Sequence, residues 1–373
     1  GYENVAVGLY ALRQNTTALF NTALGTESLR YTTTGSDNTA VGRRALYSNT
    51  TGGSNTAVGR NALATNTTGT NNTATGREAL LANTTGSYNT ATGYTALTTN
   101  TTGHSNSAFG WFSMYGNTTG IENTATGRGS LQTNTTGNYN TANGYKALYS
   151  NTTGSHNVAN GYKALYYNTT ANNNSAFGQD ALYSTTTGKG NVAFGRSAAI
   201  QATTGDYNVA VGQSALNNLI SGSGNICLGS VRGAGQYLPV FDVTTEDNRL
   251  VLGHNSITNA YVKVAFTVTS DERDKMNFAP VPYGLDFVNK LKPTAFQFKV
   301  DRDTETPNGA VRYGFKAQDI LALEGDNPVI IDTEDADHLK YKGEHLVPVL
   351  VNAIKELSAE NAALKTRLDA AGL

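Results

Sequence analysis

Apolar and polar residues alternate in a fixed phase along the first two thirds of the chain. The pattern Asn-x-Ala-x-Gly starts at Asn4 and returns every 17 residues, in 14 copies, until Asn225. An Ala-Leu pair, as at Ala45-Leu46, and an Asn-Thr-Thr-Gly turn, as at Asn49, recur in the same phase. A fixed period of this kind predicts a repeat architecture in which each unit stacks on near-identical neighbours.

Each repeat predicts two short strands joined by two turns. Gly and the Asn-Thr-Thr-Gly turn would interrupt a helix in every repeat, and the many β-branched Thr residues favour strands. The Thr-x-Val segment predicts one strand and the Ala-Leu segment a second. Gly supplies a positive φ at the corners, and Asn bonds its own backbone. The unit thus closes into one coil of a β-solenoid, along which equivalent Asn and Thr side chains stack into ladders.

The apolar content of one coil is small. The third position of the pattern is Ala in 13 copies and Cys227 in the last. Because so thin a coil would bury little core alone, we expect three chains to lie side by side in a trimeric shaft. We expect Cys227 to be a small buried residue and not a reactive thiol.

The repeats over residues 1–230 resemble the β-roll heads of trimeric autotransporter adhesins, in which an Asn-Ser-x-Ala-x-Gly pattern recurs with a shorter period. The segment Asn106-Ser107-Ala108-Phe109-Gly110 is the nearest match. Repeats of this kind also look like those of many tail fibres. The chain opens in the middle of a repeat, so either the protein starts abruptly or the array is longer. We expect a longer array, with the part that attaches it to a tail or cell surface upstream.

The distribution of charge divides the chain. Its 373 residues have a net charge of −1, and only 15% of them are charged. Residues 1–240 hold 12 basic and 7 acidic residues, which leaves 15 basic and 21 acidic residues for the remainder. We predict a shaft over 1–230, a β-rich neck over 231–269 with strands at 248–253 and 260–268, and a C-terminal domain over 270–373.

Composition also excludes several functions. There is no basic segment typical of nucleic-acid binding, and no apolar run approaches the ~18 residues of a membrane span. The five His residues show no ligand spacing, so we expect no metal and no cofactor. The scattered acidic residues of the shaft form no carboxylate pair in a loop insertion, which argues against a polysaccharide-degrading spike enzyme.

A Ser and a Lys five residues apart open the C-terminal domain, at Ser270 and Lys275. Ser becomes a nucleophile when a base takes its proton, and a desolvated Lys can be that base. The same residues also fit a helix N-cap followed by solvated charges. We expect Asp271 and Arg273 to stabilise the loop and not to react. A simple salt bridge between the two residues is the alternative.

Further motifs follow in order, at 285–288, 291–296, 313–319 and 350–357. Together with the Ser/Lys pair they resemble the C-terminal intramolecular chaperone of phage endosialidases and tail spikes, a family that also occurs in myelin regulatory factor. The resemblance spans residues 248–373. Lys316 and Asp319 depart from it, since an apolar residue and Glu are usual there.

The resemblance implies that the domain assembles three chains, helps the preceding β-structure fold and then cuts itself off. It assigns Ser270 as the nucleophile, Lys275 as its base or proton carrier, and the bond between Thr269 and Ser270 as the cleavage site. The protein would then be a single-turnover autoproteolytic serine peptidase with no other activity.

A heptad pattern occupies the C-terminal segment, with steps of three and four residues. The predicted trimer seam consists of Val347, Leu350, Ile354, Leu357, Asn361, Leu364 and Leu368. A coiled coil of three chains would bury this seam, and a polar residue such as Asn361 commonly sets its register. The alternative is a helix packed on its own domain.

The sequence therefore predicts a mainly β, homotrimeric solenoid shaft followed by an α+β chaperone domain that ends in a trimeric coiled coil. The expected setting is the tail fibre of a phage or phage-like particle, in the virion, for attachment to a host surface whose receptor the sequence does not name. The alternative is a bacterial trimeric adhesin on the cell surface. The expected partner is the chain itself, without nucleic acid and without membrane insertion.

Overall fold

The computed structural model describes residues 2–229, 231, 239–254, 257, 263, 270–299, 305–334 and 339–372. The chain forms two compact units, Gly1–Asn255 and Ser256–Leu373. No helix in the described part of the chain is both long and apolar enough to cross a membrane.

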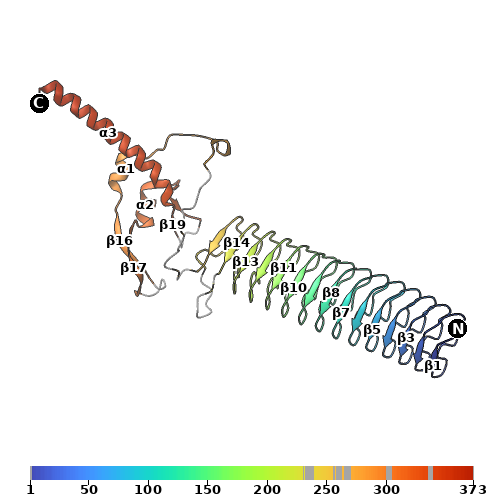
Figure 1. The fold of residues 1–373 in the computed structure, drawn as a ribbon. Coiled ribbons are helices and arrows are strands. Elements are labelled where there is room, and N and C mark those ends of the chain that lie inside the picture. Colours follow the sequence, from blue (N-terminus) through green and yellow to red (C-terminus); the bar gives the residue numbers. More distant parts are fainter. Residues whose placement is uncertain are drawn as a thin grey trace. The chain divides into compact units, whose positions relative to one another are not determined.

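The first unit is a β-solenoid with one three-residue strand per coil (Figure 1). Its strands are β1 Val5–Val7, β2 Thr22–Leu24, β3 Thr39–Val41, β4 Thr56–Val58, β5 Thr73–Thr75, β6 Thr90–Thr92, β7 Ser107–Phe109, β8 Thr124–Thr126, β9 Thr141–Asn143, β10 Val158–Asn160, β11 Ser175–Phe177, β12 Val192–Phe194, β13 Val209–Val211, β14 Ile226–Leu228 and β15 Leu250–Leu252. Each strand pairs in parallel with the next, in a single sheet. The predicted solenoid of 17-residue repeats is confirmed.

The register of the sheet follows the sequence period. Val5 pairs with Thr22, and this offset repeats from coil to coil as far as β14. The last offset is longer, because Ile226 pairs with Leu250 of β15. The strand expected at 248–253 in the neck therefore continues the solenoid sheet. The strand expected at 260–268 lies outside the described residues, apart from Lys263.

The expected second strand of each coil is wrong. The Ala-Leu segment is a turn, in which Leu46 has a φ of 51° and donates its backbone N–H to the carbonyl of Ala62 in the next coil at 3.0 Å. A left-handed residue bends the chain, so no extended run can form there. The predicted positive φ is confirmed for the Gly that ends the Asn-x-Ala-x-Gly pattern, for example Gly42, where φ is 124°. It is wrong for the Gly of the Asn-Thr-Thr-Gly turn, such as Gly52, which is not among the positive-φ residues.

The core of the solenoid lies within a single chain. In a typical coil, Ala57, Ala62 and Leu63 are fully buried. Cys227 takes the place of the core Ala in its coil and is buried, as predicted. Because one chain covers these side chains, the recurrent Ala does not itself require three chains, and the argument for a trimer from thin coils falls away.

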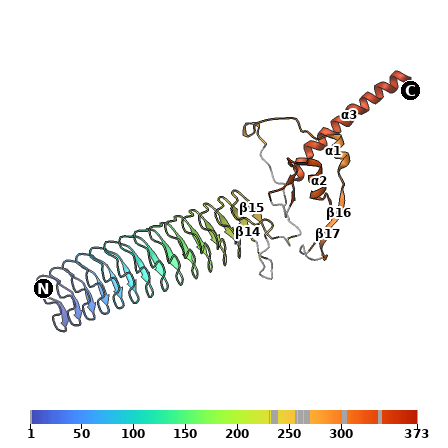
Figure 2. The ribbon, with the colours of Figure 1, turned by 180° about the vertical axis from the view of Figure 1, so that it is seen from behind.

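Two ladders of buried Asn residues replace part of the missing apolar core. In the first, Asn38 donates its Nδ2 to Asn21 Oδ1 at 3.1 Å and to the carbonyl of Gly52 at 2.9 Å. In the second, Asn66 donates its Nδ2 to Asn49 Oδ1 at 2.9 Å. Hydrogen bonds of this kind recur along the stack of coils and satisfy most of the buried amide groups, although Asn15 Oδ1 and Asn168 Oδ1 accept none. Figure 2 shows the stack of coils from behind.

The second unit is an α+β domain. Its elements are η1 Glu272–Asp274, α1 Leu285–Lys290, β16 Thr294–Lys299, β17 Pro307–Gly314, α2 Ala317–Glu324, β18 Ile331–Asp332, β19 Lys340–Tyr341, η2 Gly343–His345 and α3 Leu346–Ala371. The strands form two antiparallel pairs, β16–β17 and β18–β19. Phe287 of α1, Ile320 of α2, Ile331 of β18 and Val349 of α3 belong to one buried core, which fixes the start of α3 on the domain.

Candidate self-processing site

The structure brings Ser270 and Lys275 together. Lys275 Nζ lies 2.6 Å from Ser270 Oγ and 3.4 Å from the Ser270 carbonyl oxygen. The short helix η1 produces this contact, because it turns the chain between the two residues and its end is closed by the Lys275 N–H bonding to the Glu272 carbonyl at 3.1 Å. Two residues that are five positions apart in the sequence are thus within hydrogen-bond distance, as proton transfer between them requires.

Asp271 and Arg273 hold this turn. The Asp271 carboxylate accepts the Arg273 backbone N–H at 2.9 Å, as an N-cap of η1, and the Arg273 guanidinium at 2.5–3.1 Å. The Arg273 guanidinium holds the pKa of the Asp271 carboxyl below its usual range. Since both acidic oxygens are engaged, Asp271 supports the loop and is not free to act as a base for Ser270.

The Ser/Lys pair is open to solvent in the single chain. Ser270, Asp271, Glu272 and Lys275 are all exposed. Thr269, which contributes the acyl group of the predicted cleavage site, lies outside the described residues. Among the described residues, no group of three or more His, Cys, Asp or Glu side chains could hold a metal ion.

Helix α3 has two apolar faces. Leu346, Val349 and Ala353 are buried on the domain. The predicted seam is exposed, with exposed fractions of 66% at Ile354 and 46% at Leu357. The two expectations for this helix, a trimer seam and packing on its own domain, therefore apply to different residues. One face packs on the domain, and the seam faces away from it.

Two polar residues of α3, Asn352 and Glu356, hold the start of α1; we call them the α3 clamp. Asn352 Nδ2 donates to the Tyr283 carbonyl at 2.9 Å, and Glu356 Oε2 accepts the Leu285 N–H at 2.6 Å. A side chain on Gly284 would collide with Glu356 Oε1, at 2.1 Å from the added Cβ. No sequence pattern marks this clamp, since its residues are separated by about seventy positions.

A buried carboxylate at the end of α2 was also missed. Glu324 accepts three backbone N–H groups, from Val329, Ile330 and Ile331, at 2.7–3.0 Å. An acidic residue in the last turn of a helix opposes the helix dipole, which is the one sequence signal that could have marked Glu324. Its three bonds fix the loop between α2 and β18.

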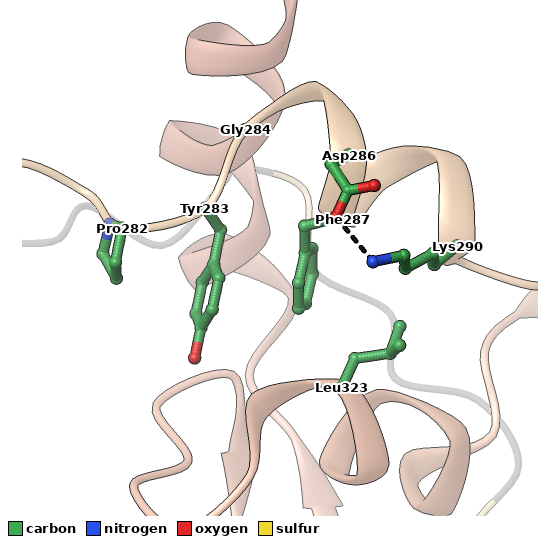
Figure 3. Close-up of a pocket in the computed structure, with 7 residues that line it drawn as sticks. All are labelled: Pro282, Tyr283, Gly284, Asp286, Phe287, Lys290 and Leu323. Atoms are coloured by element: carbon green, nitrogen blue, oxygen red, sulfur yellow. Dashed lines mark hydrogen bonds and ion pairs between the residues drawn. The ribbon is translucent and has the colours of Figure 1, made fainter.

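A pocket of about 240 Å³ lies between α1 and α2. Figure 3 shows Tyr283 and Phe287 side by side, Leu323 of α2 below Lys290, and the Asp286–Lys290 ion pair next to Phe287. Among the described residues that line this pocket there is no Ser, Cys or His.

Comparison with known families identifies this part of the chain. Residues 270–327 match the family model described as chaperone of endosialidase. The C-terminal unit therefore contains an endosialidase-type chaperone domain. The match begins at Ser270 and ends before β18, so it is narrower than the resemblance expected over 248–373, and α3 lies outside it. No curated protein and no solved structure matched the chain.

Proposed function

We propose that this protein is a homotrimeric tail-fibre shaft whose chaperone domain assembles three chains and then cuts each of them once, between Thr269 and Ser270. The proposed setting is the virion of a phage or phage-like particle, where the shaft serves attachment to a host surface. The observation that carries the proposal is the 2.6 Å contact of Lys275 with Ser270, at the first residue of the matched chaperone segment.

The exposed seam of α3 supports trimerisation. Its apolar members are partly or largely exposed in one chain, and fully burying such a side chain is worth about 1.5–3 kcal/mol. Heptad spacing allows three copies to interlock these residues as knobs into holes. Association through α3 leaves its domain-facing side, including Val349, in place.

The chemistry needs no group beyond the chain and water. Ser270 Oγ attacks the Thr269 carbonyl carbon while its proton passes to Lys275 Nζ. The bond between the Thr269 carbonyl carbon and the Ser270 nitrogen then breaks, and Lys275 returns the proton to the departing nitrogen. Water hydrolyses the resulting ester, which releases a Thr269 carboxylate and a new N-terminus at Ser270.

In this proposal, trimer assembly removes the Ser270–Lys275 pair from water, which a single chain does not do. A Lys ammonium gives up its proton more readily once it is removed from water, and both members of the pair are exposed in one chain. In the proposed mechanism, neighbouring copies cover the pair, so cleavage follows trimerisation.

The test compares the unaltered chain with Ser270→Ala and Lys275→Ala, using Glu272→Gln as a matched control on the same exposed turn. We expect the unaltered chain and the control to give a fragment beginning at Ser270, and the two variants to stay as uncut trimers. The measurements are denaturing electrophoresis, N-terminal sequencing and light scattering. A persistent cut in Ser270→Ala, or an N-terminus elsewhere, would refute the assignment.

The alternative function is a bacterial trimeric adhesin of the same architecture. The solenoid suits both functions, and the C-terminal chaperone domain favours the tail fibre. Immunogold electron microscopy with an antibody to the shaft separates the two, because label on particle tails supports the fibre and label on cell surfaces supports the adhesin.

A further inference from the structure

The basic side chains of the solenoid gather on one flank. With the first Asn of each repeat counted as position 1, ten of the eleven Lys and Arg residues within 1–229 fall at positions 6, 7 or 10, and only Lys189 does not. The ten are Arg13, Arg30, Arg43, Arg44, Arg60, Arg77, Arg128, Lys146, Lys163 and Arg196. Because coils stack in register, these positions lie in neighbouring rows along the solenoid; we call this surface the basic flank.

Aromatic residues occupy the same rows and link successive coils. Arg128 lies over the Trp111 ring at 4.3 Å from its centroid, and Lys146 over the Tyr149 ring at 4.8 Å. The Tyr149 and Tyr166 rings stack at 5.1 Å and 4°. Contacts of this kind run without a break from Arg77 and Tyr94 to Tyr183; they confirm that positions 6, 7 and 10 share one surface.

Acidic residues do not neutralise the flank. Of the seven Asp and Glu residues within 1–229, three share these rows: Glu27, Glu78 and Asp180. The flank therefore has a formal charge of +7, the difference between ten basic and three acidic residues. Glu27 and Glu78 are paired with Arg residues of the first five coils.

The central part of the flank keeps its cations available. Within the described part of the chain, Arg128 and Lys146 form no ion pair with a carboxylate, and each lies over aromatic rings instead. Lys163 also lies over aromatic rings, and the Asp180 carboxylate of the next coil attracts its ammonium without a salt bridge. A ring face attracts a cation without cancelling its charge, so the outer side of each cation can still bind an anion.

The geometry selects a linear ligand with carboxylates and hydroxyls. The cations recur along the stacking axis, which suits a polymer lying along the shaft. The Tyr rings stack on one another, so their faces are not free for nucleobases, whereas single-strand binding proteins need free faces. Tyr hydroxyls and abundant Asn and Thr side chains can instead bond sugar hydroxyls.

We infer that the basic flank, centred on Arg128, Lys146 and Lys163, binds an acidic polysaccharide along the shaft. This inference rests on the attachment role proposed above, to which it adds a surface and a ligand class. The flank suits an outward position in a trimer, because three like-charged flanks facing one threefold axis would repel each other.

The experiment uses the whole protein and the fluorescence of Trp111, the single Trp of the chain, which lies beneath Arg128. Polygalacturonate is titrated as the probe, with neutral dextran as a control. We expect a saturable change in Trp111 emission with polygalacturonate only, weakened by salt. The triple change Arg128→Gln, Lys146→Gln and Lys163→Gln should weaken binding about tenfold or more, measured by calorimetry. Lys146→Gln alone should weaken it more than Lys189→Gln, its matched control away from the flank.

Four results would contradict the inference, and each concerns the surface, the role of charge or the class of polymer. Unchanged affinity in the triple variant, or equal losses in the two single variants, would exclude the flank. Equal binding of dextran would exclude recognition by charge. Tighter binding of a single-stranded DNA than of polygalacturonate at the same salt would overturn the polysaccharide in favour of nucleic acid. Repeating the titration with Ser270→Ala separates this test from the proposed function, since polymer binding does not need cleavage.

Discussion

The second Asn ladder offers a stability test that depends on buried hydrogen bonds alone. Asn100 is fully buried and donates its Nδ2 to Asn83 Oδ1 at 2.8 Å and to the Gly103 carbonyl at 2.9 Å. Its own Oδ1 accepts from Asn117 Nδ2 at 2.8 Å. Asn100→Ala therefore leaves one buried acceptor and one buried N–H without a partner. The Gly103 carbonyl still accepts from a neighbouring Asn.

The chain contains a matched control at the end of the same ladder. Asn168 is also fully buried and donates to Asn151 Oδ1 at 2.7 Å, but its own Oδ1 accepts no hydrogen bond, because Thr185 takes the Asn position in the next coil. Asn168→Ala leaves Asn151 Oδ1 without a partner but also removes Asn168 Oδ1, which accepts no hydrogen bond, so the number of unsatisfied buried groups does not rise. Both substitutions remove the same side-chain atoms, so their difference isolates the acceptor and the N–H that only Asn100→Ala adds to the unsatisfied buried groups.

The magnitudes follow from the cost of an unsatisfied buried group, about 1–3 kcal/mol each. We expect Asn100→Ala to lose about 2–6 kcal/mol more local stability than Asn168→Ala, because it adds two unsatisfied buried groups whereas Asn168→Ala adds none on balance. Hydrogen exchange of the flanking coils measures the loss directly, because the stability of a repeat array is a sum of terms from each repeat and its neighbours. Guanidinium unfolding gives an independent ranking. Equal losses in the two variants would refute the reasoning.

Three further outcomes follow from the structure. Gly93→Ala should prevent folding of the central coils, since its Cβ would lie 2.5 Å from the Gly110 carbonyl oxygen at a φ of 140°, and circular dichroism of the purified variant checks this. Ile354→Asp with Leu357→Asp should abolish the proposed trimer by burying unpaired charge, so an unchanged mass by light scattering would count against the seam. Glu356→Ala should speed hydrogen exchange at the start of α1 without changing the mass, whereas unchanged exchange would mean that the clamp holds nothing.

The sequence predicted the stacking of the shaft but not the path of each coil. The Ala-Leu segment looks extended by residue type, yet Leu63 has a φ of 52° and a fully buried side chain. Leu rarely adopts this backbone conformation, and neighbouring coils stabilise it through the bond from Leu63 N–H to the Ala79 carbonyl at 3.0 Å. That contact depends on tertiary stacking, so local propensity could not predict the turn.

The sequence likewise predicted only one part of the contacts around the candidate site. The spacing of Ser270 and Lys275 was visible in the sequence, because five residues with an N-cap Asp form one tight turn. The α3 clamp was not, since Glu356 meets Leu285 only after α3 has packed on α1. Polar partners separated by a whole domain leave no periodic signal.

By itself, the sequence determined the register of the solenoid, the identity of the residues that line its core and ladders, and the heptad stripe of α3. It could do so because each of these features repeats with a period that matches the geometry of its element. Only the tertiary structure decided that one chain closes its own core, that α3 turns its seam away from the domain, and that positions 6, 7 and 10 of the repeat form one surface. These outcomes depend on where the turns direct each side chain, and turn paths are set by contacts between coils and helices that no local pattern contains.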